Sequence, residues 1–130
     1  MAVYVADTHA LLWYLSGDKN LTSAARSAFD EATSGSSQII VPAIVIAELV
    51  RLCEKGGIDT HISQIITTLR SRPGFLLTAL TPEIATGIQP LMTLNDIHDR
   101  LIVAEAIASG AILITRDKVI TDSGLVPVLW

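Results

Sequence analysis

The stretch "DIHDRLIVAEAIASGAILITRD" (96–117) contains the signals of a helix, of its end and of a buried strand in direct succession. A helix is predicted over 97–109, with an aspartate at its start and Gly110 as the residue that ends it. The run 111–115 is short, apolar and rich in β-branched residues, which is typical of a strand buried in a parallel sheet. A helix that leads straight into such a strand predicts an α/β protein.

The remainder of the chain repeats this alternation of strands and helices. Because parallel strands are joined by long connections, the alternation predicts a mostly parallel sheet covered by helices on both faces. Gly87 and Pro90 are expected to keep one further helix, over 81–92, short or broken. The other expected strands are 2–7, 38–41, 75–80 and 126–130, and the other expected helices are 8–15, 21–33, 43–55 and 60–72.

Length and composition limit the class of protein. The chain has 130 residues, of which 50% are hydrophobic and 17% charged, so we expect a single domain over residues 1–130 with a substantial core. The single cysteine excludes an internal disulfide and suits the reducing cytoplasm. The start, "MAVYVAD", lacks the basic region of a signal peptide, and the longest apolar run, "IIVPAIVIA", is far shorter than the ~20 residues that span a membrane. We therefore expect a cytoplasmic protein.

The net charge of the chain is −4 at pH 7. A protein that holds nucleic acid by phosphate contacts alone is usually basic. A nucleic-acid ligand would therefore need a local basic rim or bound metal ions. The high hydrophobic content is compatible with a well-buried small core and also with an apolar surface that a partner covers.

Acidic residues gather at one predicted edge of the sheet. Asp7 ends the first strand, and Asp117 lies two residues after the strand 111–115. Asp96 and Asp99 lie in the first turn of the helix before that strand, which places them at the same edge. Ligands of parallel α/β sheets bind at the carboxyl ends of the strands. Clustered carboxylates repel one another unless a cation lies between them, and oxygen-only ligands suit Mg²⁺ or Mn²⁺.

Each acid also has a structural interpretation. Asp7 and Asp96 can cap the helices that they precede, and Asp99 would be favoured near the positive end of a helix dipole. Asp117 can be a turn residue. Glu48, from a fourth segment, shares a polar helical stripe with basic residues, which favours a surface ion pair. The basic residues of that stripe are Arg51 and Lys55.

Four segments, in this order and spacing, resemble a known family: "VADTHALLWYL", "PAIVIAEL", "DIHDRLIVAEA" and "ILITRD". They resemble PIN-domain proteins, and in particular the VapC-type toxins of bacterial toxin–antitoxin pairs, over nearly the whole chain. The resemblance implies a three-layer α/β/α sandwich with a mostly parallel, roughly five-stranded sheet. It also implies a divalent-metal-dependent ribonuclease that forms a homodimer and is neutralised by a small VapB-type antitoxin.

The resemblance assigns roles to individual residues. The family's acidic positions fall on Asp7, Glu48, Asp99 and Asp117, so Glu48 becomes a predicted site residue. These four acids would be catalytic, and the three aspartates among them would hold Mg²⁺ or Mn²⁺. Asp96 would be an accessory acid. Thr115 matches a hydroxyl position near the metal site, and adjacency to the acids adds three candidates for RNA contacts or surface pairing, namely His98, Arg100 and Arg116.

The expected chemistry follows from the acids. A divalent cation lowers the pKa of a coordinated water molecule, and the resulting hydroxide would attack the RNA phosphorus in line. The 2′-hydroxyl is then not needed, so cleavage would leave 5′-phosphate and 3′-hydroxyl ends.

Three alternatives have a weaker basis in the residues. A magnesium-dependent phosphatase with an aspartyl nucleophile usually needs a second aspartate two residues after the first, where this chain has His9. A signalling receiver domain needs a phosphoacceptor aspartate after its third strand, and "FLLTALTPE" has none. A catalytically inactive PIN-fold binding module stays open, although the full set of acids argues against it.

Overall fold

The computed structural model describes residues 1–130 and contains one five-stranded sheet in which all neighbouring strands are parallel. The strand order is β3-β2-β1-β4-β5, so β1 lies in the centre. The prediction of a mostly parallel sheet of about five strands is confirmed. The strands are β1 (Val3–Ala6), β2 (Gln38–Pro42), β3 (Phe75–Thr78), β4 (Ile112–Ile114) and β5 (Val128–Leu129).

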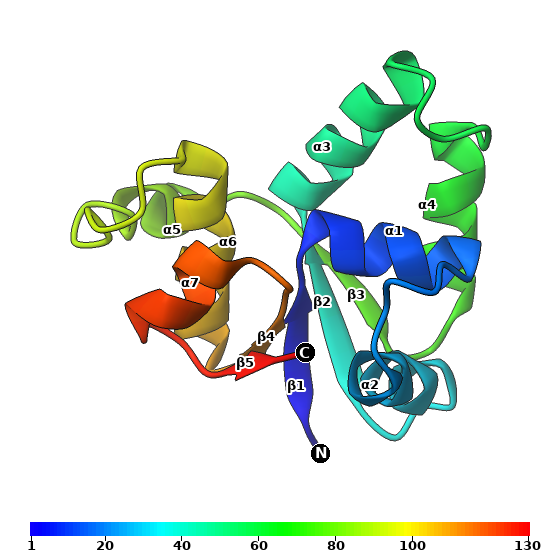
Figure 1. Cartoon of the computed structure of the whole chain (residues 1–130), viewed down its shortest axis with the longest axis horizontal. Coiled ribbons are helices and arrows are strands. Elements are labelled where there is room, and N and C mark those ends of the chain that lie inside the picture. The colour runs from blue at the N-terminus through cyan, green and yellow to red at the C-terminus, as the bar shows by residue number, and fades with distance from the viewer.

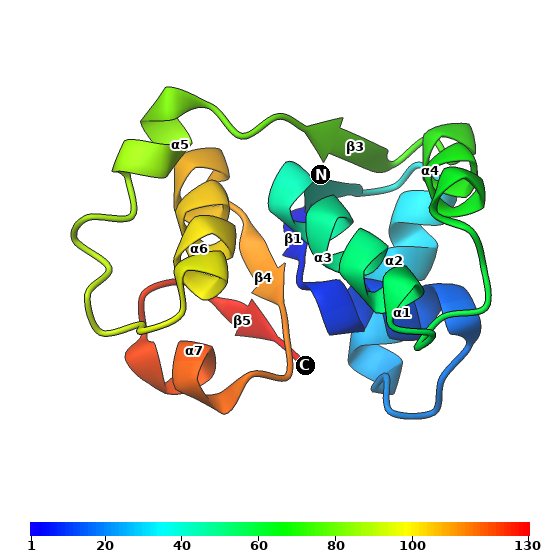
Figure 2. The ribbon, with the colours of Figure 1, turned by 90° about the horizontal axis from the view of Figure 1, so that it is seen from above.

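Helices cover both faces of the sheet and complete the three-layer α/β/α sandwich (Figure 1 and Figure 2). The chain moves outward from β1 to β3 and then crosses to β4 and β5 on the other side. With right-handed crossovers, this reversal places α1 to α4 on one face and α5 to α7 on the other. No helix among them is long and apolar enough to cross a membrane. They are α1 (Thr8–Ser16), α2 (Ser23–Thr33), α3 (Ala43–Glu54), α4 (Ile62–Ser71), α5 (Pro82–Thr86), α6 (Ile97–Ser109) and α7 (Lys118–Ser123).

The side chains of the central strands form the middle of the hydrophobic core. Val5 in β1, Val41 in β2 and Leu113 in β4 are fully buried. Each buried aliphatic side chain of this kind stabilises the fold by about 1.5–3 kcal/mol relative to an exposed one. Because helices cover both faces of these strands, their sequences are continuous apolar runs rather than alternating ones. The strand ends, where the apolar runs stop, are therefore the places where polar residues can enter.

Helix α6 begins and ends as its sequence predicts. The Oδ1 atom of Asp96 accepts hydrogen bonds from the N–H groups of His98 and Asp99, at 2.7 and 3.4 Å. Gly110 ends the helix with φ of 60°, a left-handed conformation that glycine adopts without steric cost. These two ends fix the first turn of α6 beside the carboxyl ends of the strands.

The structure differs from the sequence prediction near the end of the chain. Residues 118–123 form α7, which the sequence did not predict, and Asp117 is the N-cap of this helix rather than a simple turn residue. The helix has six residues, too few for a periodic apolar pattern to be visible. The strands expected over 75–80 and 126–130 are shorter than predicted, and both lie at the edges of the sheet.

Candidate functional site

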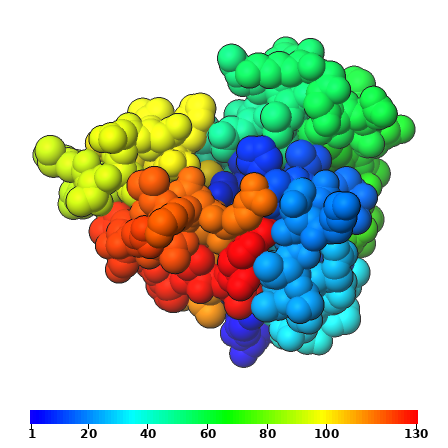
Figure 3. All heavy atoms as spheres, in the orientation of Figure 1, coloured from blue at the N-terminus to red at the C-terminus, as the bar shows by residue number.

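The carboxyl ends of β1 and β4 lie side by side at one edge of the sheet. The register pairs Ala6 with Ile114, and the Asp7 N–H donates to the Ile114 carbonyl at 3.0 Å. Asp7 and Thr115 therefore follow adjacent strand ends. The molecule is hollowed near this edge, between the lobe of α5 and α6 and the lobe of α3 and α4 (Figure 3). Blue atoms from the first part of the chain lie at the floor of this hollow.

Two hydrogen bonds hold the Asp7 carboxylate in place. Its Oδ1 atom accepts from the Thr8 N–H at 2.7 Å, and its Oδ2 atom accepts from the Thr115 hydroxyl at 2.6 Å. The Thr115 hydroxyl in turn accepts from the Asp117 N–H at 3.0 Å, so one buried threonine links both aspartates. Burial raises the pKa of Asp7, and the hydrogen bond from Thr115 lowers it only in part.

Glu48 reaches the site from α3 through contacts with two other helices. Its Oε1 atom accepts a hydrogen bond from the Thr8 hydroxyl of α1 at 2.7 Å. Its Oε2 atom lies 3.4 Å from Nδ1 of His98 on α6. Glu48 forms no ion pair with Arg51 or Lys55, so the surface pair suggested by the helical wheel is wrong. The carboxylate is directed toward the ends of α1 and α6 instead.

Asp99, in the first turn of α6, is the acid whose pKa all the other acids of the cluster raise. Its pKa is raised to about 6, first by burial and then by the negative charges of four other carboxylates. Unlike Asp7, it has no hydrogen bond that stabilises its charged form. In order of decreasing effect, the four carboxylates are those of Asp96, Asp117, Asp7 and Glu48. The structure therefore brings the other four predicted acids within electrostatic reach of Asp99.

Asp96 and Asp117 both cap helices, and this role is compatible with a place in a ligand-binding site. Asp117 accepts a hydrogen bond from the Ile120 N–H through Oδ1 at 2.9 Å, as an N-cap does. Asp96 also uses its Oδ1 atom to cap α6. In both residues the second carboxylate oxygen makes no bond of this kind and is free to face a ligand. The structural and functional interpretations of these acids therefore coexist.

The donor chemistry of this cluster fits a hard divalent cation, although the side chains do not form a completed coordination sphere. No three His, Cys, Asp or Glu side chains are arranged around a common point as metal ligands. The donors are carboxylate oxygens, which Mg²⁺ and Mn²⁺ prefer. A cation among them would lower the pKa of Asp99 by offsetting the repulsion that raises it.

Arg100 and Arg116, the two arginines next to the acids in the sequence, make different contacts. Arg100 donates from Nε to the carbonyl oxygen of Leu94 at 2.5 Å, so it is directed at the loop before α6. Arg116 is exposed, and its guanidinium carbon lies 4.6 Å from the ring centroid of Trp13. It forms no ion pair with Asp117 or with Asp7.

Two hollows flank the acid cluster. The first has a volume of about 320 Å³, within the range of ligand-sized pockets. Its lining consists of Asp7, His9, Ala10, Trp13, Arg116 and Asp117. The second is lined by Thr8, His9, Glu48, Arg51, Leu52, Lys55 and His98. Histidine, arginine and lysine side chains thus surround the acids on both sides.

Sequence reasoning missed the aromatic residues at the first hollow. Trp13 lies 5.6 Å from the ring of His9 and 5.9 Å from that of Trp130, measured between centroids. The helical spacing of Trp13 is by itself typical of a core or interface residue. The useful signal was its place on α1, the helix that Asp7 caps, but the contact with Trp130 leaves no local pattern in the sequence.

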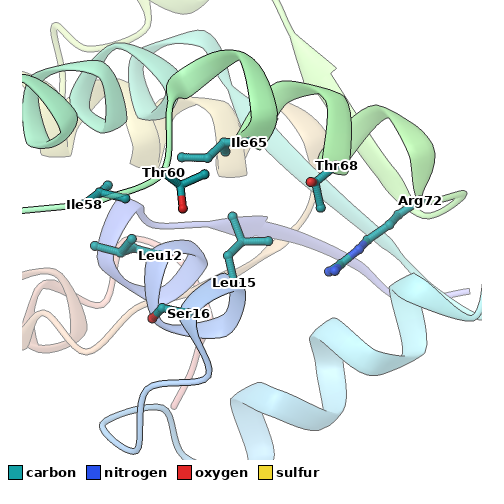
Figure 4. Close-up of a pocket in the computed structure, with 8 residues that line it drawn as sticks. All are labelled: Leu12, Leu15, Ser16, Ile58, Thr60, Ile65, Thr68 and Arg72. Atoms are coloured by element: carbon teal, nitrogen blue, oxygen red, sulfur yellow. The ribbon is translucent and has the colours of Figure 1, made fainter.

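A separate, partly apolar groove lies between α1 and α4. Figure 4 shows Leu12 and Leu15 of α1 directed toward Ile65 of α4, with Arg72 at one end. The groove shares no lining residue with the two hollows at the acids. Arg72 is its only charged residue, so it lacks the carboxylates that hydrolytic chemistry needs.

With this five-stranded parallel α/β fold, the chain belongs to the PIN-domain family. A family model of the PIN domain matches residues 4–123. The search of curated proteins gives no match. The family prediction from the sequence is confirmed.

Among solved structures, the chain is similar in fold to chains of toxin–antitoxin complexes and to a toxin. VapBC2 from Rickettsia felis, bound to a DNA fragment from its promoter, shares 18% identity with a TM-score of 0.75, over 98% of each chain. A toxin–antitoxin complex from Klebsiella pneumoniae shares 22% sequence identity with a TM-score of 0.69, over 100% of this chain and 97% of the other chain. Mycobacterium tuberculosis VapC20, described as a sarcin–ricin loop cleaving toxin, shares 14% sequence identity with a TM-score of 0.68, over 95% of each chain. At these identities the likeness concerns the fold.

Proposed function

We propose that the protein is a divalent-metal-dependent endoribonuclease and the toxin of a toxin–antitoxin pair. The observation that carries the proposal is the convergence of four other carboxylates on Asp99 at one edge of a PIN-family fold. Repulsion between carboxylates does not stabilise the fold. A cluster of this kind is therefore typical of a site where a bound cation offsets the repulsion. The catalytic residues would be Asp7, Glu48, Asp99 and Asp117.

The three aspartates of this set would hold Mg²⁺ or Mn²⁺. When bound, the cation lowers the pKa of a coordinated water molecule and stabilises negative charge on phosphoryl oxygens. Thr115 keeps the Asp7 carboxylate in one orientation through its hydrogen bond. Thr8 does the same for Glu48. Because Asp99 has no such bond, it is free to adjust its position to the ligand.

The partners of the protein are part of the same proposal. Several similar structures are complexes of a toxin with its antitoxin, which supports a VapB-type antitoxin as the partner of this chain. We expect an antitoxin segment to cover the site edge, and a homodimer of the toxin in the cytoplasm. Light scattering of the purified protein over a wide concentration range tests the dimer. A molecule that stays monomeric throughout excludes it.

Cleavage of cellular RNA tests the enzymatic activity. Purified protein is incubated with total RNA and Mg²⁺ or Mn²⁺, beside Asp99→Asn and a control, Asp59→Asn. Asp59 is exposed and lies outside both hollows at the acids, so its variant should cut like the parent protein. Asp99→Asn should lose cleavage. Equal cleavage by all three proteins would exclude Asp99 from the reaction.

A further inference from the structure

Arg116 is a cation at the acid cluster whose hydrogen-bonding groups are uncommitted. It lines the first hollow together with Asp7 and Asp117 but pairs with neither. Its guanidinium instead lies over the ring of Trp13, with 4.6 Å between the guanidinium carbon and the ring centroid. An arginine on an aromatic face keeps its N–H donors available for an anion, and the planar group suits a phosphate.

Trp13 is held in place by two other aromatic rings. Its centroid lies 5.9 Å from that of Trp130, which follows β5, and 5.6 Å from that of His9 on its own helix. The ring is half-buried, and Arg116 over it is exposed. Three separate parts of the chain therefore build one aromatic and cationic surface next to the acids.

The first hollow leads to further basic residues. His9 lines both hollows, and the second also contains Arg51 and Lys55. Other cations near the acids are already engaged, because Arg100 donates to a backbone carbonyl and Lys118 pairs with its neighbour on α7. The uncommitted cations thus lie in the two hollows that border the acids. These residues supply the local basic rim that a chain with a net charge of −4 would need in order to bind nucleic acid.

We propose that Trp13 and Arg116 form a subsite for an unpaired RNA nucleotide next to the scissile phosphate. Arg116 contacts the flanking phosphate through its N–H donors, and the unpaired base stacks on the surface that the guanidinium and the Trp13 ring form together. The inference rests on the proposed ribonuclease function and assigns two residues of this chain to the nucleotide beside the scissile phosphate. Bases within a duplex stack on one another and do not reach a protein ring, whereas unpaired bases stack on aromatic side chains. Such stacking is tolerant of sequence, so the subsite selects unpaired structure rather than a particular base.

Binding measurements with four variants test the subsite. The probe is a short fluorescein-labelled single-stranded RNA of mixed sequence, compared with the same strand in a duplex. Binding is followed by anisotropy with Mg²⁺ present, in the Asp99→Asn background so that the probe stays intact. The variants are Arg116→Gln, Arg116→Lys, Trp13→Phe and Trp13→Leu, and Arg70→Gln serves as the control. Arg70 is an exposed arginine of α4 that lines none of these hollows.

The two residues should change binding in different ways. Arg116→Gln should weaken binding of the single strand about tenfold and reduce the slope of log K against log salt by about 0.7, the value of one phosphate contact. Trp13→Leu should weaken it by a similar factor of roughly ten with no change of slope, because stacking carries no charge. Arg116→Lys should keep the slope, and Trp13→Phe should keep most of the affinity. Arg70→Gln should bind like the parent, and duplex binding should be insensitive to Trp13.

The outcomes separate this subsite from the proposed function. If the wild-type protein cleaves RNA and Arg116→Gln and Trp13→Leu match Arg70→Gln in affinity, slope and KM, the subsite is wrong and the ribonuclease stands. If the wild-type protein neither binds nor cleaves RNA, both are wrong. Melting temperatures identify a purely structural pair, for which stability falls while the affinity of the folded protein is unchanged. In the wild-type background, the two substitutions should raise KM more than they lower kcat.

Discussion

The Thr115 hydroxyl donates a hydrogen bond to Oδ2 of Asp7 at 2.6 Å and joins the ends of the adjacent strands β1 and β4, although the two residues lie 108 positions apart in the sequence. Thr115 is fully buried and also accepts from the Asp117 N–H. One side chain thus sets the relative positions of two proposed metal ligands. The finding explains why a hydroxyl residue belongs between a buried strand and the acid that follows it.

Replacement of this hydroxyl by a methyl group should affect both stability and activity. Thr115→Val leaves a buried Asp7 oxygen and the Asp117 N–H without their partner, which costs about 1–3 kcal/mol of unfolding free energy. The pKa of Asp7 should rise further, because the bond from Thr115 lowers it. RNA cleavage should fall as well. Thr115→Ser keeps the hydroxyl and should retain most of both properties in denaturant unfolding and cleavage assays. Equal loss in both variants would point to packing as the role of Thr115.

Removal of the charge at Asp99 should stabilise the metal-free protein. Asp99→Asn relieves repulsion from four carboxylates, so its melting temperature in EDTA should equal or exceed that of the wild type. Stabilisation by added Mg²⁺ should weaken because a ligand has been lost. Asp96→Asn is the matched comparison, since asparagine caps a helix almost as well as aspartate. It should change melting, metal response and cleavage much less than Asp99→Asn. A fall in metal-free stability on Asp99→Asn would mean that this acid supports the fold.

The metal-free protein should lose stability as the pH rises from about 4 to about 6. The pKa of Asp99 is about 6 in the folded protein against an ordinary value of 3.8, so within this window the folded state binds a proton that the unfolded state has released. Proton binding by the folded state stabilises it below the window, and this stabilisation disappears above it. The raised pKa of Asp7 acts in the same direction. After allowance for solvent screening of the half-exposed Asp99, its contribution is on the order of 1–2 kcal/mol.

Urea unfolding in EDTA across this pH range measures the effect. Asp99→Asn should flatten part of the pH dependence, and Mg²⁺ should restore stability at the upper end of the range. A wild-type curve that rises with pH, with the same shape in Asp99→Asn, would contradict the pKa assigned to Asp99.

Local patterns explain why much of the fold was accessible from the sequence. The apolar strands, the Asp96 cap and Gly110 act over a few residues, and the rule for parallel sheets then places Asp7 and Asp117 at one edge. The orientation of Glu48 was inaccessible to the helical wheel, because its partners Thr8 and His98 belong to other helices.

The aromatic surface of the first hollow could not be predicted from local patterns either, because its residues come from separate parts of the chain. Trp13, Trp130 and Arg116 meet only after the chain has folded, so their contacts have no counterpart in spacing or composition. Helix α7 was missed for a different reason, since six residues are too short to show a period.

The decisive experiment for the proposed ribonuclease is cleavage of RNA with and without a divalent cation. Purified wild-type protein is incubated with RNA in excess EDTA, then with Mg²⁺ or Mn²⁺ added beyond the chelator, and the new ends are mapped. We expect no cleavage in EDTA, restored cleavage with either ion, and products that carry 5′-phosphate and 3′-hydroxyl ends. Undiminished cleavage in EDTA, or products with 2′,3′-cyclic phosphate ends, would contradict the proposed metal-dependent mechanism.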